Sequence, residues 1–215
     1  MTPDAVALYL KQHPEFFEQY ADMLSEVFIP HPHGGRAIPI SERQILTLRD
    51  KGKQLESKLR ELIEYGEEND AIGEKLQRLA LALLSARDLE TIGEVLYSSL
   101  GEDFAVPHVA LRLWPEGAIS PLPEFAPVSD GAKEFAASLV NPYCGVRAIV
   151  DTAAWFGEAA PLLKSFAYVA LKSGERTLGL LALASEDPQR FYPEMGTLYL
   201  KRLGELIAAA ALRYL

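Results

Sequence analysis

The chain has 215 residues, 49% of them hydrophobic, and a formal net charge of −9. The hydrophobic content is enough for a sizeable buried core and excludes an intrinsically disordered chain. The acidic balance, without a basic stripe, argues against a nucleic-acid partner, because phosphate contacts supply most of the affinity in nucleic-acid binding.

Other bulk features favour a cytoplasmic protein. No uncharged apolar run approaches the ~18–20 residues that a membrane-spanning helix needs, so no membrane partner is expected. The first residues, Met1 to Asp4, lack the basic start and apolar core of a secretion signal. The single cysteine, Cys144, rules out an internal disulfide and a cysteine-based metal site, and it suits a reducing compartment.

Residues 1–40 are predicted to form a short helical region followed by a loop. His13 and Pro14 separate two helical stretches, because the residue before a proline avoids helical geometry. Apolar side chains then recur at helical spacing over residues 16–28. Residues 30–35 are rich in proline and glycine, and we expect a loop there.

Residues 41–85 are predicted to form one long helix of coiled-coil type. Ser41 and Gln44 have the spacing of a capping box, and no proline follows before residue 85. Leucine occupies five of six positions of one heptad column, which is typical of a coiled coil. The d positions are Leu48, Leu55, Leu62, Asn69, Leu76 and Leu83, and the a positions are Ile45, Gly52, Leu59, Gly66, Gly73 and Ala80.

The heptad pattern of this helix predicts a homodimer. Asn69 interrupts the leucine column, and a buried polar residue fixes register and the dimeric state at some cost in stability. The alternative is a long helix that packs on the N-terminal helices of its own chain. The predicted dimer contacts are Leu48, Leu55, Leu59, Leu62, Asn69, Leu76 and Leu83.

Residues 86–215 are predicted to form an α+β domain, an antiparallel sheet with helices on one face. Lys172 to Glu175 has the composition of a hairpin turn between the last two strands. The predicted strands are residues 109–114, 146–150, 165–172 and 177–184, and the predicted helices are residues 88–100, 132–139, 152–163 and 194–215.

The order of these elements resembles the GAF and PAS superfamily of small sensory domains. Residues 168–171 and 178–183, followed by the loop at residues 187–191 and a helix, are similar to the closing strand pair, loop and helix of a GAF domain. Within the loop, Asp187 and Pro188 are expected to make a turn that docks Phe191 in the core, and anion binding by Arg190 is the alternative.

The whole chain resembles a narrower bacterial family, domain of unknown function 484. The similarity covers both ends and the long helix. It implies a GAF-like domain behind a helical N-terminal region, and it implies no established activity, cofactor or catalytic residue. The matching stretches are residues 9–10, 14–17, 30–35, 41–49, 69 and 185–206.

Candidate chemistry in the sequence is sparse. His31 and His33 could offer two imidazoles to a metal, but a site needs three or four ligands and no matching cluster is nearby, so no metal is expected. Cys144 lies close to Arg147, which could lower the pKa of the thiol. A buried structural thiol is the competing interpretation, and we favour it. No nucleophile, base and acid set is evident, and we expect no enzymatic activity.

The resemblance to GAF domains implies a ligand between the sheet and the helix-containing connection that crosses its face. We expect Arg112 or Arg147 to be the charged anchor of such a site. Leu111, Leu113 and Phe166 are further candidates for its walls. The predicted ligand-binding residues are Arg112, Phe125, Tyr143, Cys144, Arg147, Trp155, Phe156 and Tyr168.

The sequence therefore predicts a non-catalytic sensory or regulatory protein. It would bind a small molecule of unknown identity, act through a coiled-coil dimer and pass its signal to a downstream protein. The alternative is an interaction scaffold with a filled, ligand-free pocket. A cavity of a few hundred Å³ with a polar anchor would favour the first hypothesis, and a side-chain-filled interior the second.

Overall fold

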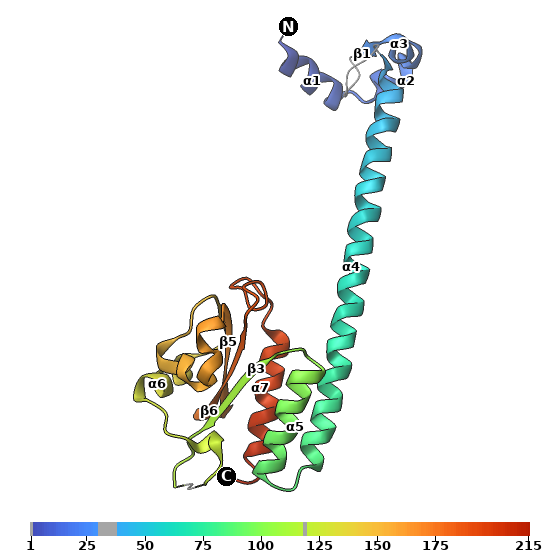
Figure 1. The fold of residues 1–215 in the computed structure, drawn as a ribbon. Helices are drawn as coiled ribbons and strands as arrows, with labels where there is room; N and C mark the ends of the chain where they lie inside the picture. Colours follow the sequence, from blue (N-terminus) through green and yellow to red (C-terminus); the bar gives the residue numbers. More distant parts are fainter. Residues whose placement is uncertain (1, 30–37, 118–119) are drawn as a thin grey trace. The chain divides into compact units, whose positions relative to one another are not determined.

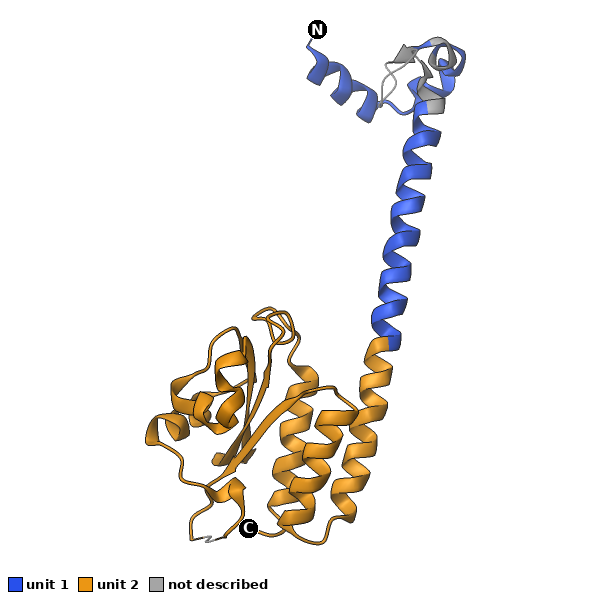
Figure 2. Cartoon of the chain, in the orientation of Figure 1, with its two compact units in different colours: residues 1–67 blue, residues 68–215 orange. Residues whose placement is uncertain are grey.

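The computed structural model describes residues 2–29, 38–117 and 120–215 (Figure 1). The chain divides into two compact units, residues 1–67 and residues 68–215 (Figure 2). The division falls inside helix α4, which runs from Ile40 to Ser85.

The first unit begins with three short helices and a small antiparallel ladder. Thr2 caps α1 by accepting a hydrogen bond from the backbone N–H of Ala5 at 3.4 Å. The second predicted helix is interrupted at Tyr20, where φ of −117° and ψ of 34° leave the helical region and separate α2 from α3. The predicted loop at residues 30–35 lies outside the described residues. The elements are α1 (Pro3–Gln12), α2 (Glu15–Gln19), α3 (Ala21–Glu26), β1 (Phe28–Ile29) and β2 (Ile38–Pro39).

The long helix predicted for residues 41–85 is confirmed as α4, which has 46 residues. It begins at Ile40, so Ser41 is a helical residue and does not precede the helix as the predicted capping box requires. Helix ends commonly differ by a residue or two from their sequence signals.

The second unit starts inside α4, because the end of this helix supplies core side chains. Leu76, Leu79 and Leu83 are all buried, and they pack in the same cluster as α5 (Leu89–Glu102). The domain start predicted at residue 86 therefore lies within this unit. Asp88 caps α5, because its carboxylate accepts the backbone N–H of Thr91 at 2.8 Å.

The sheet of the second unit is antiparallel, with the strand order β3-β6-β5-β4. The predicted hairpin joins β5 and β6, and Gly174 in its turn takes a φ of 60°, a left-handed value that glycine adopts at no steric cost. The strand predicted at residues 146–150 is wrong. Pairing with β5 stops at Gly145, and Val150 has a φ of 47°, which is incompatible with a strand. The strands are β3 (His108–Leu113), β4 (Tyr143–Gly145), β5 (Ser165–Ser173) and β6 (Arg176–Ser185).

Helices cover both faces of this sheet, and not one face as predicted (Figure 1). The end of α4, α5 and α7 (Leu198–Ala211) cover the first face. The second face is covered by α6 (Asp130–Ser138) and by η2 (Val150–Leu162), a 3₁₀ segment with a kink at Gly157. A short 3₁₀ turn, η1 (Pro123–Phe125), contacts β3. The fold class is α+β, as predicted.

Side-chain alternation along β6 explains why residues 178–184 of this strand include no polar side chain. Leu181 and Leu183 belong to the core cluster on the α7 side, whereas Leu180 and Ala182 belong to the cluster on the η2 side. A strand that is covered on both faces needs apolar residues at every position, so it shows no polar alternation.

Candidate functional site

Aromatic side chains fill the sheet face on which the sequence predicts a ligand. Tyr168 lies at its centre with 0% of its surface exposed. Phe135 meets the Tyr168 ring edge-on with 5.5 Å between centroids, and Phe166 lies parallel to it at 6.3 Å. The Tyr168 hydroxyl lies 2.7 Å from the Thr152 hydroxyl and accepts the backbone N–H of Ile149 at 3.2 Å. Burial raises the pKa of Tyr168. These side chains form a packed and internally hydrogen-bonded core. We call it the aromatic face, and it consists of Phe135, Ile149, Thr152, Phe166 and Tyr168.

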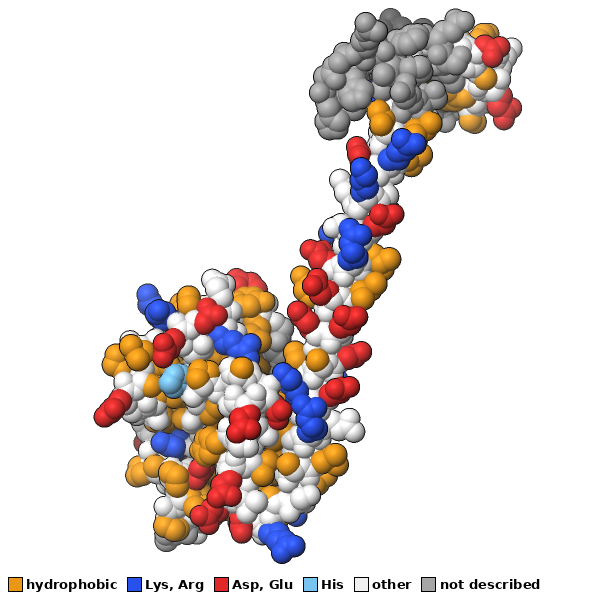
Figure 3. Space-filling model, turned by 45° about the vertical axis from the view of Figure 1, so that its right-hand side comes forward, with side chains coloured by type: hydrophobic (Ala, Val, Ile, Leu, Met, Phe, Trp, Pro, Cys, Tyr) orange, Lys and Arg blue, Asp and Glu red, His pale blue; other side chains and the backbone are white. Residues whose placement is uncertain are grey.

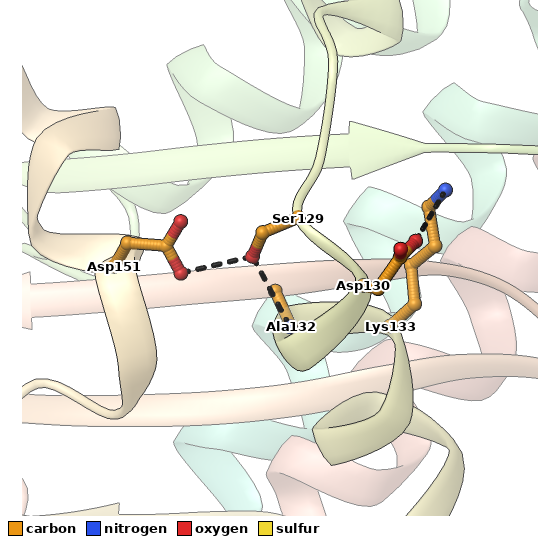
Figure 4. A network of polar contacts seen from close by, with 5 residues as sticks. All are labelled: Ser129, Asp130, Ala132, Lys133 and Asp151. Carbon is orange, nitrogen blue, oxygen red and sulfur yellow. Dashed lines mark hydrogen bonds and ion pairs between the residues drawn. The ribbon is translucent and has the colours of Figure 1, made fainter.

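Polar contacts fasten α6 to η2 beside the aromatic face (Figure 4). The Ser129 hydroxyl donates to the Asp151 carboxylate at 2.9 Å and accepts the backbone N–H of Ala132 at 3.3 Å. It therefore caps α6 and ties that helix to η2 at the same time. Lys133 pairs with Asp130 on the exposed first turn of α6 at 3.7 Å.

The structure brings together about half of the predicted ligand-binding residues. The guanidinium of Arg112 lies over the ring of Trp155 at 5.4 Å and donates to the carbonyl of Leu111 at 2.8 Å. Phe125 and Cys144 pack instead in the cluster on the α7 side of the sheet, together with the wall candidates Leu111 and Leu113. Arg147 is exposed. The predicted residues that do gather around the aromatic face are Tyr143, Trp155, Phe156 and Tyr168, with Arg112 over Trp155.

Cys144 is a buried thiol with only 6% of its surface exposed. Burial raises its pKa from an ordinary value of about 9 to about 11. The thiol is therefore protonated and weakly nucleophilic at neutral pH. Strand alternation explains its position, because neighbouring residues of β4 face opposite sides of the sheet and Tyr143 occupies the aromatic side.

The first face of the sheet holds a cavity of about 390 Å³ between α4, the end of α5 and the start of α7. We call it the α4–α7 cavity. Leu76, Leu100 and Leu203 form part of its apolar wall and are 7%, 1% and 3% exposed. Lys75 and Arg190 also line it. A cavity of this volume, with apolar walls and a few charged groups, has the features of a small-molecule site.

Polar contacts fix the edge of the α4–α7 cavity. Arg190 donates to the carbonyl of Phe104 at 2.7 Å, and the Lys75 ammonium lies 5.9 Å from the centre of the Phe104 ring. The Tyr199 hydroxyl donates to the carbonyl of Asn69 at 3.0 Å, so α7 is tied to α4. Ala105 has a φ of 52°, a value that costs energy for a residue other than glycine and that is often found at functional sites.

Sequence reasoning did not predict the α4–α7 cavity. Its lining comes from three distant stretches, residues 72–76, 100–106 and 183–203. No local pattern connects these stretches. One signal is present in the sequence, because Arg190 is a candidate anion ligand in the loop before α7.

A row of apolar side chains is exposed on the part of α4 that belongs to the first unit. We call it the leucine stripe. These side chains are 51% to 69% exposed, at a and d positions of the predicted heptad, and hydrophobic side chains are visible along this helix among charged ones (Figure 3). The leucine stripe consists of Ile45, Leu48, Leu55, Leu59 and Leu62.

The predicted dimer contacts in the second unit need correction. Leu76 and Leu83 are 7% and 2% exposed because they pack in the core of their own unit, so they are not available to a partner helix. Asn69 is exposed, and its carbonyl accepts the hydrogen bond from Tyr199.

Metal-binding clusters and membrane spans are absent from the described part of the chain. There, no group of three or more His, Cys, Asp or Glu side chains could hold a metal ion. The pair His31 and His33 lies outside the described residues. Within the described ranges, every helix is too short or too polar to cross a membrane.

Comparisons with known proteins identify three similarities. A family described as "Protein of unknown function, DUF484" matches residues 1–215. The "Uncharacterized protein YigA" of Salmonella typhimurium (strain LT2) is 24% identical over 216 residues, which cover 94% of this chain and 88% of that protein. A crystal structure of the native GAF domain of the potassium sensor histidine kinase KdpD from Escherichia coli is 18% identical, with a TM-score of 0.37. The match covers 66% of this chain and 93% of that chain.

Proposed function

The chain belongs to the DUF484 family, whose function is unknown, and we propose that it is a non-catalytic regulatory protein that pairs with a second copy through α4 and binds a small molecule in its second unit. The observation that carries this proposal is that α4 bears the leucine stripe and also lines the α4–α7 cavity. Residues 45–62 of α4 carry the leucine stripe, and residues 72–76 line the α4–α7 cavity.

The leucine stripe supports a second copy of the same chain as its partner. Apolar residues at a and d positions are self-complementary, since two such helices interlock side by side. One pair of flanking charges fits a parallel arrangement. Lys51 occupies a g position and Glu56 the e position of the following heptad, so Lys51 of one copy would face Glu56 of the other. Leaving these leucines in water is unfavourable by roughly 1.5–3 kcal/mol per side chain relative to burial.

The α4–α7 cavity supports a ligand-binding role. A ligand there would contact Ile72, Lys75 and Leu76 of α4, so it would act directly on the helix that carries the stripe. Binding would change the state of the dimer only if the ligand prefers one packing of α4 over another. In that case the ligand sets which surface the dimer offers to a downstream protein.

The competing hypothesis is an interaction scaffold without a ligand. The packed aromatic face favours the scaffold, because the predicted site is occupied by Tyr168 and its neighbours. The α4–α7 cavity favours the regulatory protein, because its volume of about 390 Å³ is adequate for a small molecule.

Native mass spectrometry of the purified full chain tests both parts of the proposal. We expect twice the mass of one chain, with a retained small molecule on the dimer. A single-chain mass at high micromolar concentration would contradict the proposed pairing. A dimer that never carries a bound small molecule would favour the scaffold.

A further inference from the structure

Two cations line the α4–α7 cavity beside Phe104. Lys75 comes from α4 and Arg190 from the loop before α7, and both reach Phe104, the first through the ring and the second through the carbonyl. The only carboxylate among the described lining residues is that of Asp103. It lies 3.4 Å from the guanidinium of Arg78, and Arg78 does not line the cavity. The edge of the cavity therefore carries a net positive charge, although the whole chain has a net charge of −9.

Neither cation has a carboxylate partner of its own in the part of the chain that the structure describes. Among the described residues, no ion pair within 4.0 Å includes Lys75 or Arg190. The guanidinium of Arg190 donates to a neutral carbonyl, and the ammonium of Lys75 faces an aromatic ring. Both cations retain hydrogen-bond donors for a further acceptor, because an ammonium has three donors and a guanidinium five.

The interior of the cavity is apolar. Leu100, Leu183 and Phe191 line it and are at most 2% exposed, and Met195 lies among them with an unbranched, adaptable side chain. These walls favour a hydrocarbon chain or ring over a sugar or a nucleobase, because a buried polar group without a hydrogen-bond partner is costly.

The start of α7 adds a positive contribution. Gly196, Tyr199 and Leu200 line the cavity, so the first turn of this 14-residue helix lies at the site. Thr197 precedes the helix and makes no side-chain capping hydrogen bond. The N-terminal end of a helix carries partial positive charge and favours an anion.

We propose that the α4–α7 cavity binds an amphiphilic anion, with an apolar chain or ring inside the cavity and a carboxylate or phosphate held between Lys75 and Arg190. This inference rests on the proposed function and names the chemical class of its ligand. A cationic amphiphile is repelled at the edge. A neutral one leaves both cations without a partner, and free inorganic phosphate leaves the apolar walls empty.

Calorimetric titration of the full chain with three probes tests this class. Octanoate has both required parts, 1-octanol lacks the charge, and inorganic phosphate lacks the apolar chain. We expect octanoate to bind with a Kd below about 1 mM. We expect 1-octanol to bind about tenfold more weakly, because it loses the charge-assisted hydrogen bonds. No binding of inorganic phosphate is expected.

A matched pair of variants locates the binding site. The variant Lys75→Gln/Arg190→Gln is expected to bind octanoate about tenfold more weakly than the wild type and to lose the preference over 1-octanol. The control variant Arg176→Gln/Lys201→Gln removes two exposed positive charges outside the cavity and is expected to bind octanoate like the wild type.

Three results would overturn the proposal: no octanoate binding by the wild type, equal binding of octanoate and 1-octanol, or unchanged octanoate binding by Lys75→Gln/Arg190→Gln. Failure of the proposed function is distinguishable from these results, because subunit number and retained ligand are measured independently by native mass spectrometry. A dimer that retains a neutral small molecule but rejects octanoate would contradict only the ligand class.

Discussion

Replacing both Leu55 and Leu62 with glutamate is expected to separate the proposed dimer into single chains. The two side chains are 69% and 66% exposed in one copy, and they lie seven residues apart in the d column of the leucine stripe. Pairing would bury each of them with a gain of roughly 1.5–3 kcal/mol. Glutamate reverses that gain and places like charges opposite each other. We expect at least about a 100-fold weaker dimer by sedimentation equilibrium, which is about 2.7 kcal/mol.

The control for this prediction is the variant Gln54→Glu/Ser57→Glu. It adds two carboxylates to the same exposed part of α4 but at positions outside the a and d columns. We expect it to dimerise within a few-fold of the wild type. A dimer that survives Leu55→Glu/Leu62→Glu would show that the leucine stripe is not the contact, and equal weakening by the control would show a general charge effect.

Replacing Leu83 with alanine is expected to destabilise the second unit by about 2–5 kcal/mol. This side chain is 2% exposed and lies in the core cluster with residues of α5 and α7. Alanine leaves a cavity that the surrounding helices fill only in part. Urea unfolding followed by tryptophan fluorescence measures this effect, because both tryptophans, Trp114 and Trp155, belong to the second unit.

Leu81→Ala is the matched control, since it makes the same substitution two residues earlier at a side chain that is 58% exposed. We expect a change within about 0.5 kcal/mol in the free energy of unfolding. A change in the free energy of unfolding as small for Leu83→Ala as for this control would contradict a core role of α4 at residue 83. The second unit would then begin near residue 86, as the sequence predicts.

The sequence could predict α4 but not which part of this helix is buried in the second unit. Leucine at the d position looks the same at residue 62, where it is exposed, and at residue 83, where it is buried. A periodic apolar pattern indicates that one side of a helix packs against a partner. It does not show whether that partner belongs to the same chain or to another. Leu83 is buried and Leu62 exposed because α5 and α7 pack against the end of α4. The heptad spacing does not predict that contact.

The candidate site was only partly predictable for a similar reason. The aromatic composition of residues 143–168 indicated a cluster, and Tyr143, Trp155 and Tyr168 do gather on one face. Whether the cluster encloses a ligand depends on side-chain packing, and the Tyr168 hydroxyl is already paired with Thr152. The position of Cys144 on the opposite face could be predicted from the sequence, because neighbouring residues of a strand face opposite sides of the sheet.

Disulfide trapping at the leucine stripe reports whether two copies of α4 pair in parallel. In a Cys144→Ser background, cysteine is introduced at Leu55 or, as an off-stripe control, at Ser57. Two copies that pair in parallel through the stripe place equivalent d positions side by side. We therefore expect rapid formation of disulfide-linked dimers for Leu55→Cys and little for Ser57→Cys under mild oxidation. Equal linkage at both positions, or none at Leu55→Cys in any concentration range, would contradict this expectation.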